Sequence, residues 1–146
     1  MQFDTASAGP AIGGIVRYTM PVRWGDMDAQ RHVNNTVYFR FMEEARVRLF
    51  EEAGIALSAK RVGVLAHTSC DFLKPVIYPA TVVITQVLRR VGRSSMAIDV
   101  TIEREDEPGV PYATGNFIMV CAHVETGKSV PWSNVELEGF AKLFRT

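Results

Sequence analysis

The sequence has few cysteines and no excess of charge of either sign. Its 146 residues include two cysteines, Cys70 and Cys121, and neither belongs to a CxxC motif. Two cysteines are too few for a disulfide scaffold, so we expect a reducing, cytoplasmic setting and two buried, apolar thiols. The 16 basic and 16 acidic residues cancel. This balance does not favour nucleic-acid binding, which needs a basic excess.

Long apolar runs are also missing. No stretch approaches the roughly 20 apolar residues that cross a bilayer, so we expect no membrane span. The opening "MQFDTASAGPAIGG" lacks the basic and apolar segments of a secretory signal. Its Gly, Ala and Ser content predicts a flexible arm over residues 1–14. Residues 15–146 contain no repeat or linker, and we expect them to form a single domain.

One long amphipathic helix is the clearest element of the sequence. In "NTVYFRFMEEARVRLFEEAGI" apolar residues recur at steps of three and four, which predicts a helix from about Asn35 to Ala53. Asn34 or Asn35 is a good N-cap, and Gly54 is a natural stop. Opposite charges four residues apart predict three ion pairs, each worth roughly 0.2–0.5 kcal/mol: Arg40–Glu44, Glu44–Arg48 and Arg48–Glu52.

The remaining elements are mostly strands. Alternating and β-branched residues predict strands over residues 15–24, 61–76, 80–91, 94–105 and 112–125. Pro21 weakens the first of these. The tail 133–146 predicts a short helix, with Ser133 and Glu136 forming a capping box. This order indicates an α+β fold with an antiparallel sheet. One helix covers one sheet face only, so we expect a homodimer or homotetramer.

The connection between the first strand and the long helix is unusual. It reads "WGDMDAQRHVNN" and contains two acids, an Arg, a His and paired Asn residues. Connections this long are usually functional or disordered. The helix that follows directs its first backbone N–H groups back at this loop, where they suit a developing negative charge.

The loop and its surroundings resemble a known family. The stretch "RWGDMDAQRHVNNTVYFRFMEEAR" is similar to the signature of the hotdog acyl-CoA thioesterases, the 4-hydroxybenzoyl-CoA thioesterase superfamily. Later pieces, "CDFLKPVIYPATVVI", "RRVGRSS" and "HVETGKSVPW", resemble that family in the same order. The resemblance extends from about Val16 to Trp132. It implies a hotdog fold, in which a five-stranded antiparallel sheet wraps around one long helix, here with an additional short C-terminal helix.

The same resemblance implies an activity and its residues. It implies hydrolysis of an acyl-CoA thioester to a carboxylic acid and coenzyme A, without a cofactor. Asp28 matches the family's catalytic carboxylate, which acts as general base or as nucleophile. The backbone amide of Asn35 matches the group that polarises the thioester oxygen. Asp26, the first acid of the pair, is expected to make a structural hydrogen bond in the loop.

The role of His32 is open. A subset of the family, the plant-type fatty acyl thioesterases, places a catalytic His at this position. That subset also has an Asn two residues after the acid, where this sequence has Gln30. His32 is therefore expected either to take part in catalysis or to order the loop by hydrogen bonding.

Candidate substrate-binding residues come from two regions. In the family, the strand after the helix can line the neighbouring subunit's active site, and His67 and Ser69 alternate on one face of it. The basic turn between the third and fourth predicted strands suits the phosphates of coenzyme A. The predicted substrate-binding residues are Gly63, Val64, His67, Arg89, Arg90 and Arg93.

Several other chemistries lack their motifs. The sequence has no His/Cys/Asp/Glu cluster with metal-ligand spacing, no Ser nucleophile elbow and no P-loop. Three alternatives to an acyl-CoA thioesterase stay open. They are a thioesterase acting on acyl carrier protein, a non-catalytic acyl-CoA-binding module, and a hotdog dehydratase, which the loop fits less well. The preferred acyl group and the choice between dimer and tetramer are also open.

Overall fold

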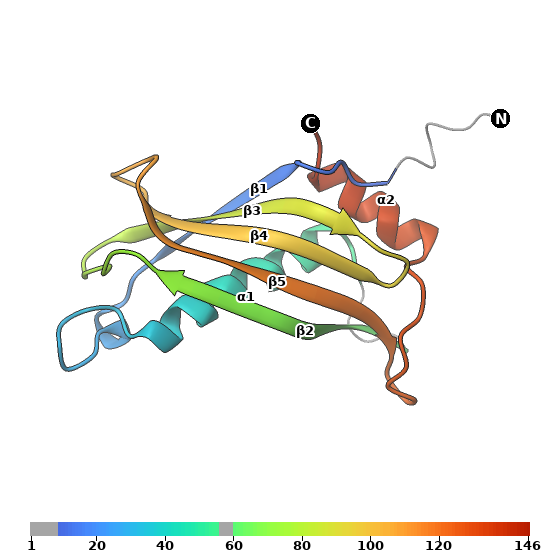
Figure 1. Ribbon diagram of the computed structural model, residues 1–146, viewed down its shortest axis with the longest axis horizontal. Helices are drawn as coiled ribbons and strands as arrows, with labels where there is room; N and C mark the ends of the chain where they lie inside the picture. The colour runs from blue at the N-terminus through green and yellow to red at the C-terminus, as the bar shows by residue number, and fades with distance from the viewer. Residues whose placement is uncertain (1–8, 56–59) are drawn as a thin grey trace.

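The computed structural model describes residues 9–55 and 60–146 and has seven regular helices and strands in these ranges. Residues 1–8 of the expected N-terminal arm lie outside the described residues. The elements are β1 Ile15–Pro21, α1 Asn35–Glu52, β2 Arg61–Phe72, β3 Thr81–Val91, β4 Ser95–Arg104, β5 Pro111–His123 and α2 Asn134–Leu143. The expected α+β class is confirmed (Figure 1).

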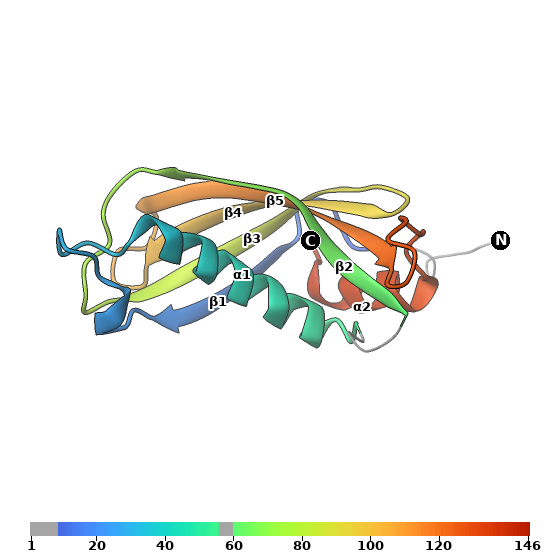
Figure 2. The same cartoon turned by 90° about the horizontal axis from the view of Figure 1, so that it is seen from below.

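A five-stranded antiparallel sheet forms the body of the molecule. Its strand order is β1-β3-β4-β5-β2, so β1 and β2 are the two edges. The sheet curves around α1, which lies across one face of it (Figure 2). This arrangement of one long helix held by an antiparallel sheet, with a short C-terminal helix, confirms the predicted hotdog architecture.

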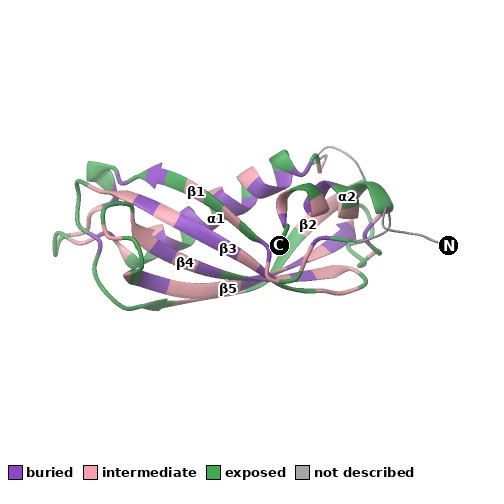
Figure 3. Ribbon diagram, turned by 90° about the horizontal axis from the view of Figure 1, so that it is seen from above, coloured by how far each residue is buried: buried purple, intermediate pink, exposed green. Residues whose placement is uncertain are grey.

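The core lies between α1 and the sheet. Along β3 and β4, buried residues alternate with more accessible ones, as the period of two requires (Figure 3). The helix contributes Tyr38, Phe41, Met42, Ala45 and Leu49, all at most 3% exposed. Fully burying a large apolar side chain contributes roughly 1.5–3 kcal/mol. Packing of this helix face against the sheet therefore stabilises the fold substantially.

Both ends of α1 are set by the predicted residues. Asn34 is the N-cap, and its Oδ1 accepts a hydrogen bond from Thr36 N at 2.9 Å. Gly54 follows the helix with φ +78°, a left-handed conformation that favours glycine. The caps place the first turn of α1 directly after the unusual loop.

Two of the three predicted ion pairs on α1 are present. Glu44 lies 3.5 Å from Arg40 and 2.8 Å from Arg48. The third predicted pair, between Arg48 and Glu52, is wrong. Arg48 donates instead to the Thr19 carbonyl, and Glu52 accepts a hydrogen bond from the Tyr18 hydroxyl. Both side chains bind to β1, which sequence spacing along the helix could not reveal.

The ends of two strands differ from the prediction. β1 ends at Pro21, and Trp24–Asp26 form a 3-10 turn instead of continuing the strand to residue 24. β2 ends at Phe72 instead of residue 76, before the segment that contains Pro75. Cys121 is buried as expected, whereas Cys70 on β2 is only half-buried.

The C-terminal helix docks against the far end of α1. Its predicted capping box is present: Ser133 Oγ accepts from Glu136 N, and Glu136 Oε1 accepts from Ser133 N. Phe140 packs edge-on against Phe50 of α1 at a ring distance of 5.3 Å. In the described part of the N-terminal region, Gly13 N donates to the Leu88 carbonyl at 2.8 Å, which extends the contacts of β3.

The edge strand β2 is accessible in this single chain. Val64, Leu65 and Phe72 are 45%, 39% and 45% exposed, which is high for large apolar side chains. The sheet face opposite α1 is also not covered by another described element (Figure 2). The expected oligomer stays a prediction. No helix among residues 9–55 and 60–146 has the length and apolar character needed to span a membrane.

Candidate active site

Asp26 ties the loop between β1 and α1 to the helix. Its side chain is only 3% exposed. Its Oδ2 accepts a hydrogen bond from Arg23 N at 2.8 Å, and its Oδ1 accepts one from Arg40 Nη2 at 2.9 Å. The Asp26 carbonyl also accepts from Asn34 N. These bonds confirm the expected structural role of Asp26.

Asp28 is held differently, with one oxygen fixed and one oxygen available. Its Oδ1 accepts hydrogen bonds from Gln30 N at 2.8 Å and His32 N at 3.3 Å. Its own N–H donates to the His32 carbonyl, and Arg31 completes the tight loop with φ +64°. Within residues 9–55 and 60–146, Oδ2 has no hydrogen-bond partner. The loop thus fixes the orientation of the carboxylate and leaves one oxygen available for chemistry.

The first residue of α1 lines the same space as Asp28. Asn35 is the first helical residue after its N-cap, a position whose N–H has no partner within a helix. In the described part of the chain this N–H donates no hydrogen bond. A cavity of about 480 Å³ brings together three predicted catalytic residues, Asp28, His32 and Asn35. The His32 side chain makes no hydrogen bond to any described residue, so its loop contacts are those of its backbone.

Tyr38 and the segment after β2 also line this cavity. The Tyr38 hydroxyl accepts a hydrogen bond from Val76 N at 3.1 Å and donates to the Lys74 carbonyl. Burial raises the pKa of the Tyr38 hydroxyl above its ordinary value. Phe72 packs edge-on against Tyr38 at 5.1 Å. The cavity lining therefore includes a packed aromatic pair together with Asp28 and Asn35.

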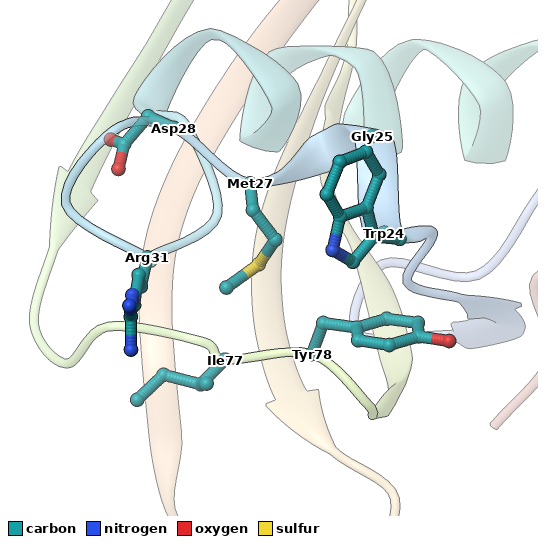
Figure 4. Close-up of a pocket in the computed structure, with 7 residues that line it drawn as sticks. All are labelled: Trp24, Gly25, Met27, Asp28, Arg31, Ile77 and Tyr78. Atoms are coloured by element: carbon teal, nitrogen blue, oxygen red, sulfur yellow. The ribbon is translucent and has the colours of Figure 1, made fainter.

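A second cleft of about 640 Å³ lies on the other side of the loop. Trp24, Met27 and Tyr78 give it an apolar, aromatic wall (Figure 4). Trp24 is 77% exposed. The Asp28 carboxylate points away from Trp24 and Tyr78 in Figure 4. Asp28 is nevertheless part of the rim of this cleft.

The predicted residues of β2 do not join Asp28 within one chain. Gly63 lines a separate cavity of about 270 Å³ between β2 and α1. Val64 and His67 are exposed on the edge strand. His67 pairs with Ile118 and Ser69 with Asn116, which places His67 and Ser69 on one face of the sheet, as predicted.

The predicted arginines lie at the other end of the sheet. The turn between β3 and β4 is opposite the loop at Asp28 (Figure 1), because Thr81 at the start of β3 pairs with Pro21. Arg89 forms an ion pair with Asp99 at 2.7 Å. Arg90 donates to Ser95 Oγ at 3.5 Å, and the Arg93 carbonyl accepts from Trp132 N. A single chain thus does not bring these arginines to the Asp28 cavity.

Arg46 is a charged residue that the sequence-based selection missed. It is only 9% exposed and lies on the buried side of α1. One signal was present in the sequence, since Arg46 follows Met42 by four residues and precedes Leu49 by three, inside the apolar stripe. Tyr38, another lining residue, belongs to the apolar stripe of α1, so its position in the sequence indicates only a core residue. The aromatic residues Trp24 and Tyr78 carried no spacing signal, because they come from separate loops.

Comparisons with known proteins identify relatives over most of the chain. The "Uncharacterized protein YsmA" of Bacillus subtilis is 31% identical over 118 residues, 80% of this chain and 79% of that protein. Among solved structures, "PA2801 protein, a putative Thioesterase from Pseudomonas aeruginosa" is 39% identical with a TM-score of 0.78, and the match covers 81% of this chain and 92% of that one.

A third relative shares the fold. The 1,4-dihydroxy-2-naphthoyl-CoA thioesterase Slr0204 from Synechocystis has a TM-score of 0.80 at 18% identity, over 89% of this chain and 98% of that one. The family model of the Thioesterase-like superfamily matches residues 22–140, which include the loop, the long helix and the sheet from β2 to β5. The family model and the match to the PA2801 protein support thioester hydrolysis as the general chemistry, and the chain belongs to the Thioesterase-like superfamily.

Proposed function

We propose that this protein hydrolyses acyl-CoA thioesters, with Asp28 as the reacting carboxylate and the Asn35 amide as the oxyanion donor. One observation carries the proposal. Asp28, whose carboxylate is oriented through Oδ1, and Asn35, the first residue of α1, line the same cavity. A thioester carbonyl placed there has a base or nucleophile on one side and a hydrogen-bond donor for its oxygen on the other.

The hydrolysis can follow either of two routes. In the first, Asp28 takes a proton from water, and the hydroxide oxygen bonds to the carbonyl carbon. The carbonyl oxygen becomes an oxyanion that accepts from Asn35 N–H; the C–S bond then breaks and the thiolate takes the proton from Asp28. In the second, Asp28 Oδ2 bonds to the carbonyl carbon, the thiolate leaves, and water hydrolyses the resulting anhydride.

Relatives support coenzyme A as the thiol. The names of two neighbours with the same fold, a 1,4-dihydroxy-2-naphthoyl-CoA thioesterase and a gentisyl-coenzyme A thioesterase, contain a CoA thioester. The phosphates of coenzyme A would bind basic side chains. Arg89, Arg90 and Arg93 stay the predicted residues for this role, although the ion pair with Asp99 competes for Arg89.

We also propose that a second copy of the chain completes the site. β2 is an unpaired edge of 12 residues with exposed Val64, Leu65 and Phe72. An exposed edge strand of this kind favours pairing with another strand. Antiparallel pairing of two β2 edges about a two-fold axis satisfies both edges at once. It would bring β2 of one copy, with Val64 and His67, towards the cavity of the other.

The experiment measures release of free thiol from acyl-CoAs with short, long and aromatic acyl groups. Asp28→Asn keeps the size and loop acceptor of the side chain but removes its negative charge. We expect a loss of at least ~10²-fold in kcat/KM for the best substrate. Asp106→Asn, which neutralises an exposed acid on the β4–β5 turn, is the control.

The outcomes separate the alternatives. Turnover by Asp28→Asn equal to that of the wild type would remove Asp28 from the mechanism. Tight acyl-CoA binding without turnover on any thioester would indicate a binding module. Turnover of acyl carrier protein thioesters alone would show that acyl carrier protein, and not coenzyme A, carries the acyl group of the substrate. The proposed hydrolysis at Asp28 would stay the same.

A further inference from the structure

The cleft on the other side of the loop from the Asp28 cavity has two exposed aromatic rings. Trp24 and Tyr78, which are 77% and 42% exposed, line it together with Met27 and Ile77. The aromatic pairs and cation–π contacts within the described part of the chain involve other rings. Large apolar side chains that gather at one exposed hollow indicate a binding site, whereas single exposed ones are common.

Two backbone hydrogen bonds join the walls of this cleft. Val22 N donates to the Ala80 carbonyl at 2.8 Å, and Val33 N donates to the Val76 carbonyl at 2.9 Å. The loop that carries the tryptophan and the segment that carries the tyrosine are thus tied together at two points. The cleft volume of about 640 Å³ is within the range of small-molecule sites, roughly 300–1,000 Å³. The cleft is therefore formed before a ligand binds.

Arg31 places a cation at one end of the same cleft. In Figure 4 its side chain lies on the Asp28 side of the cleft, and the rings of Trp24 and Tyr78 lie on the opposite side. The ion pairs formed within residues 9–55 and 60–146 do not involve its guanidinium. An exposed guanidinium of this kind suits an anionic ligand, and phosphate matches its planar set of donors.

We propose that this cleft binds the nucleotide end of coenzyme A, with the adenine against Trp24 and Tyr78 and a phosphate at Arg31. This inference rests on the proposed thioesterase function. Asp28 lines both the cleft and the cavity that contains Asn35, so a thioester at Asp28 lies where the two meet. Coenzyme A has its phosphates between its thiol and its adenine. The cleft has its cation at the Asp28 end and its rings at the other, which is the same order.

An acyl group is a poorer occupant of this cleft. An apolar chain gains most where water is excluded, and Trp24 is largely exposed. An apolar chain would also give Arg31 no partner. A nucleotide has a π face that stacks on exposed aromatic side chains and carries the charge that Arg31 can bind. The Asp28 cavity, with Tyr38 and Phe72 in its lining, is left for the acyl group.

The β3–β4 turn is the competing place for the phosphates. Arg89, Arg90 and Arg93 lie at the other end of the sheet from Asp28 in one chain, so they serve this substrate only across a contact between subunits. The cleft needs one chain only. None of the described residues that line it belongs to β2, the edge proposed to pair with a second copy. Nucleotide binding in the cleft is therefore independent of that pairing.

Binding of adenosine 3′,5′-bisphosphate, the nucleotide fragment of coenzyme A, tests the site without hydrolysis. The only tryptophan besides Trp24 is Trp132, which is buried, so quenching of tryptophan emission reports mainly on Trp24. We expect quenching in the wild type. By calorimetry, Trp24→Ala should weaken the affinity by about 5- to 100-fold, the effect of removing one stacking side chain. Trp24→Phe keeps a smaller ring and should lie between the two.

Arg31→Asn tests the phosphate contact. Arg31 has a left-handed backbone with φ +64°, which asparagine adopts more readily than most residues, so the loop should keep its shape. We expect the affinity for the bisphosphate to fall about tenfold, the effect of losing one charged hydrogen bond. The remaining affinity should depend less on salt than that of the wild type, because one charge pair is gone.

A second measurement compares two donors of the same acyl group. Acyl-CoA carries the nucleotide, and the matching acyl-pantetheine lacks it. The readout is the ratio of kcat/KM between them, which should exceed one in the wild type. In Trp24→Ala this ratio should fall by about 5- to 100-fold, through KM and not kcat, with acyl-pantetheine turnover unchanged. A merely structural effect would lower the turnover of both donors equally.

Arg17→Asn and Val135→Ala are the matched controls. Arg17 is an exposed cation on β1, and Val135 is an apolar side chain of α2 that is 74% exposed. Neither residue lines the cleft or the Asp28 cavity. Both variants should keep the wild-type affinity for the bisphosphate and the wild-type ratio between donors.

Three results would overturn the proposal. One is a wild type that does not bind the bisphosphate, or binds it no better than Trp24→Ala does. Another is an equal loss on acyl-CoA and acyl-pantetheine in Trp24→Ala, which would place the acyl group in the cleft. The third is loss of bisphosphate binding on combining Arg89→Gln, Arg90→Gln and Arg93→Gln, with unchanged affinity in Trp24→Ala. That result would place the nucleotide at the β3–β4 turn.

Failure of this site and failure of the proposed function are distinguishable. Bisphosphate binding that is lost in Trp24→Ala would support the nucleotide site even if no thioester were hydrolysed. Hydrolysis of acyl-CoA with a wild-type donor ratio of one or less would sustain the thioesterase and overturn the nucleotide site.

Discussion

The buried carboxylate of Asp26 accepts a hydrogen bond from Arg40 Nη2 at 2.9 Å, fourteen residues further along the chain. This contact joins the loop before α1 to the second turn of the helix. Asp26 and Asp28 are two residues apart and chemically identical, yet one is 3% exposed and fully engaged while the other keeps a free oxygen. The same substitution, made at each aspartate in turn, therefore distinguishes a structural role from a chemical one.

Asp26→Asn should lower stability and Asp28→Asn should lower the rate. In Asp26→Asn the new side-chain amide would present a donor to Arg40 or to Arg23 N, which leaves buried groups unsatisfied. We expect a loss of about 2–3 kcal/mol in the free energy of unfolding. Asp28→Asn keeps an oxygen acceptor for both loop N–H groups and should stay within about 1 kcal/mol of the wild type. Urea denaturation of both variants checks this, and equal losses would contradict the division of roles.

The Asn35 amide can be removed without removing the helix. Proline is well tolerated at the first helical position, where its missing N–H has no partner in the helix. Asn34 already has the extended backbone, φ −59° and ψ 137°, that a residue before proline prefers. Asn35→Pro should therefore fold and lose about 10²–10³-fold in kcat. Asn35→Ala retains the N–H and is the control; a similar loss in both variants would assign the effect to the side chain.

Gly139 fixes the distance between α2 and the end of α1. A Cβ at this position would overlap the carbonyl oxygen of Ala53. Alanine favours a helix over glycine by about 1 kcal/mol, but the forced displacement of α2 costs more. Gly139→Ala should therefore lower the free energy of unfolding by about 1–3 kcal/mol, measured by chemical denaturation. The exposed Glu138→Ala is the control, and a stabilised Gly139→Ala would show that α2 can shift freely.

Glu136 makes stability depend on pH below the neutral range. Burial raises the pKa of Glu136, but hydrogen bonds from Arg61 and Ser133 outweigh it and hold the pKa below its usual value. Its contribution is therefore complete above the unfolded-state pKa, about 4.3, and is lost as the pH falls through the lower folded-state pKa. Glu136→Gln should cost roughly 1 kcal/mol at pH 7, with a difference from the wild type that shrinks below about pH 4. A difference that stays constant down to about pH 3 would exclude this ion pair as the cause.

Local signals in the sequence predicted the helices and strands, and the family resemblance of the loop implied the three residues that meet at the candidate site. The periodicity of α1, its cap at Asn34 and the stop at Gly54 depend on neighbouring residues only, and all three are confirmed. Asp28, His32 and Asn35 lie within eight residues of each other in one loop and one helix start. Their meeting at one cavity is accordingly a short-range property of the chain.

Features that depend on distant residues were not predictable in this way. The Arg48–Glu52 pair failed because Tyr18 and Thr19 of β1 supply other partners. The arginines of the β3–β4 turn lie away from Asp28 because β3 runs antiparallel to β1. Sequence spacing along one element contains no information about the strand that comes to lie beside it.

The sequence by itself determined the α+β class, the long capped helix, the antiparallel strands and the carboxylate placed before a helix N-terminus. These follow from hydrophobic periodicity, capping and turn residues, which act over a few residues. Tertiary structure alone decided that β2 is an edge, that Asp26 is buried while Asp28 keeps a free oxygen, and that Trp24 and Tyr78 line one cleft. Burial and pairing depend on which surfaces meet, and these surfaces come from residues far apart in the chain.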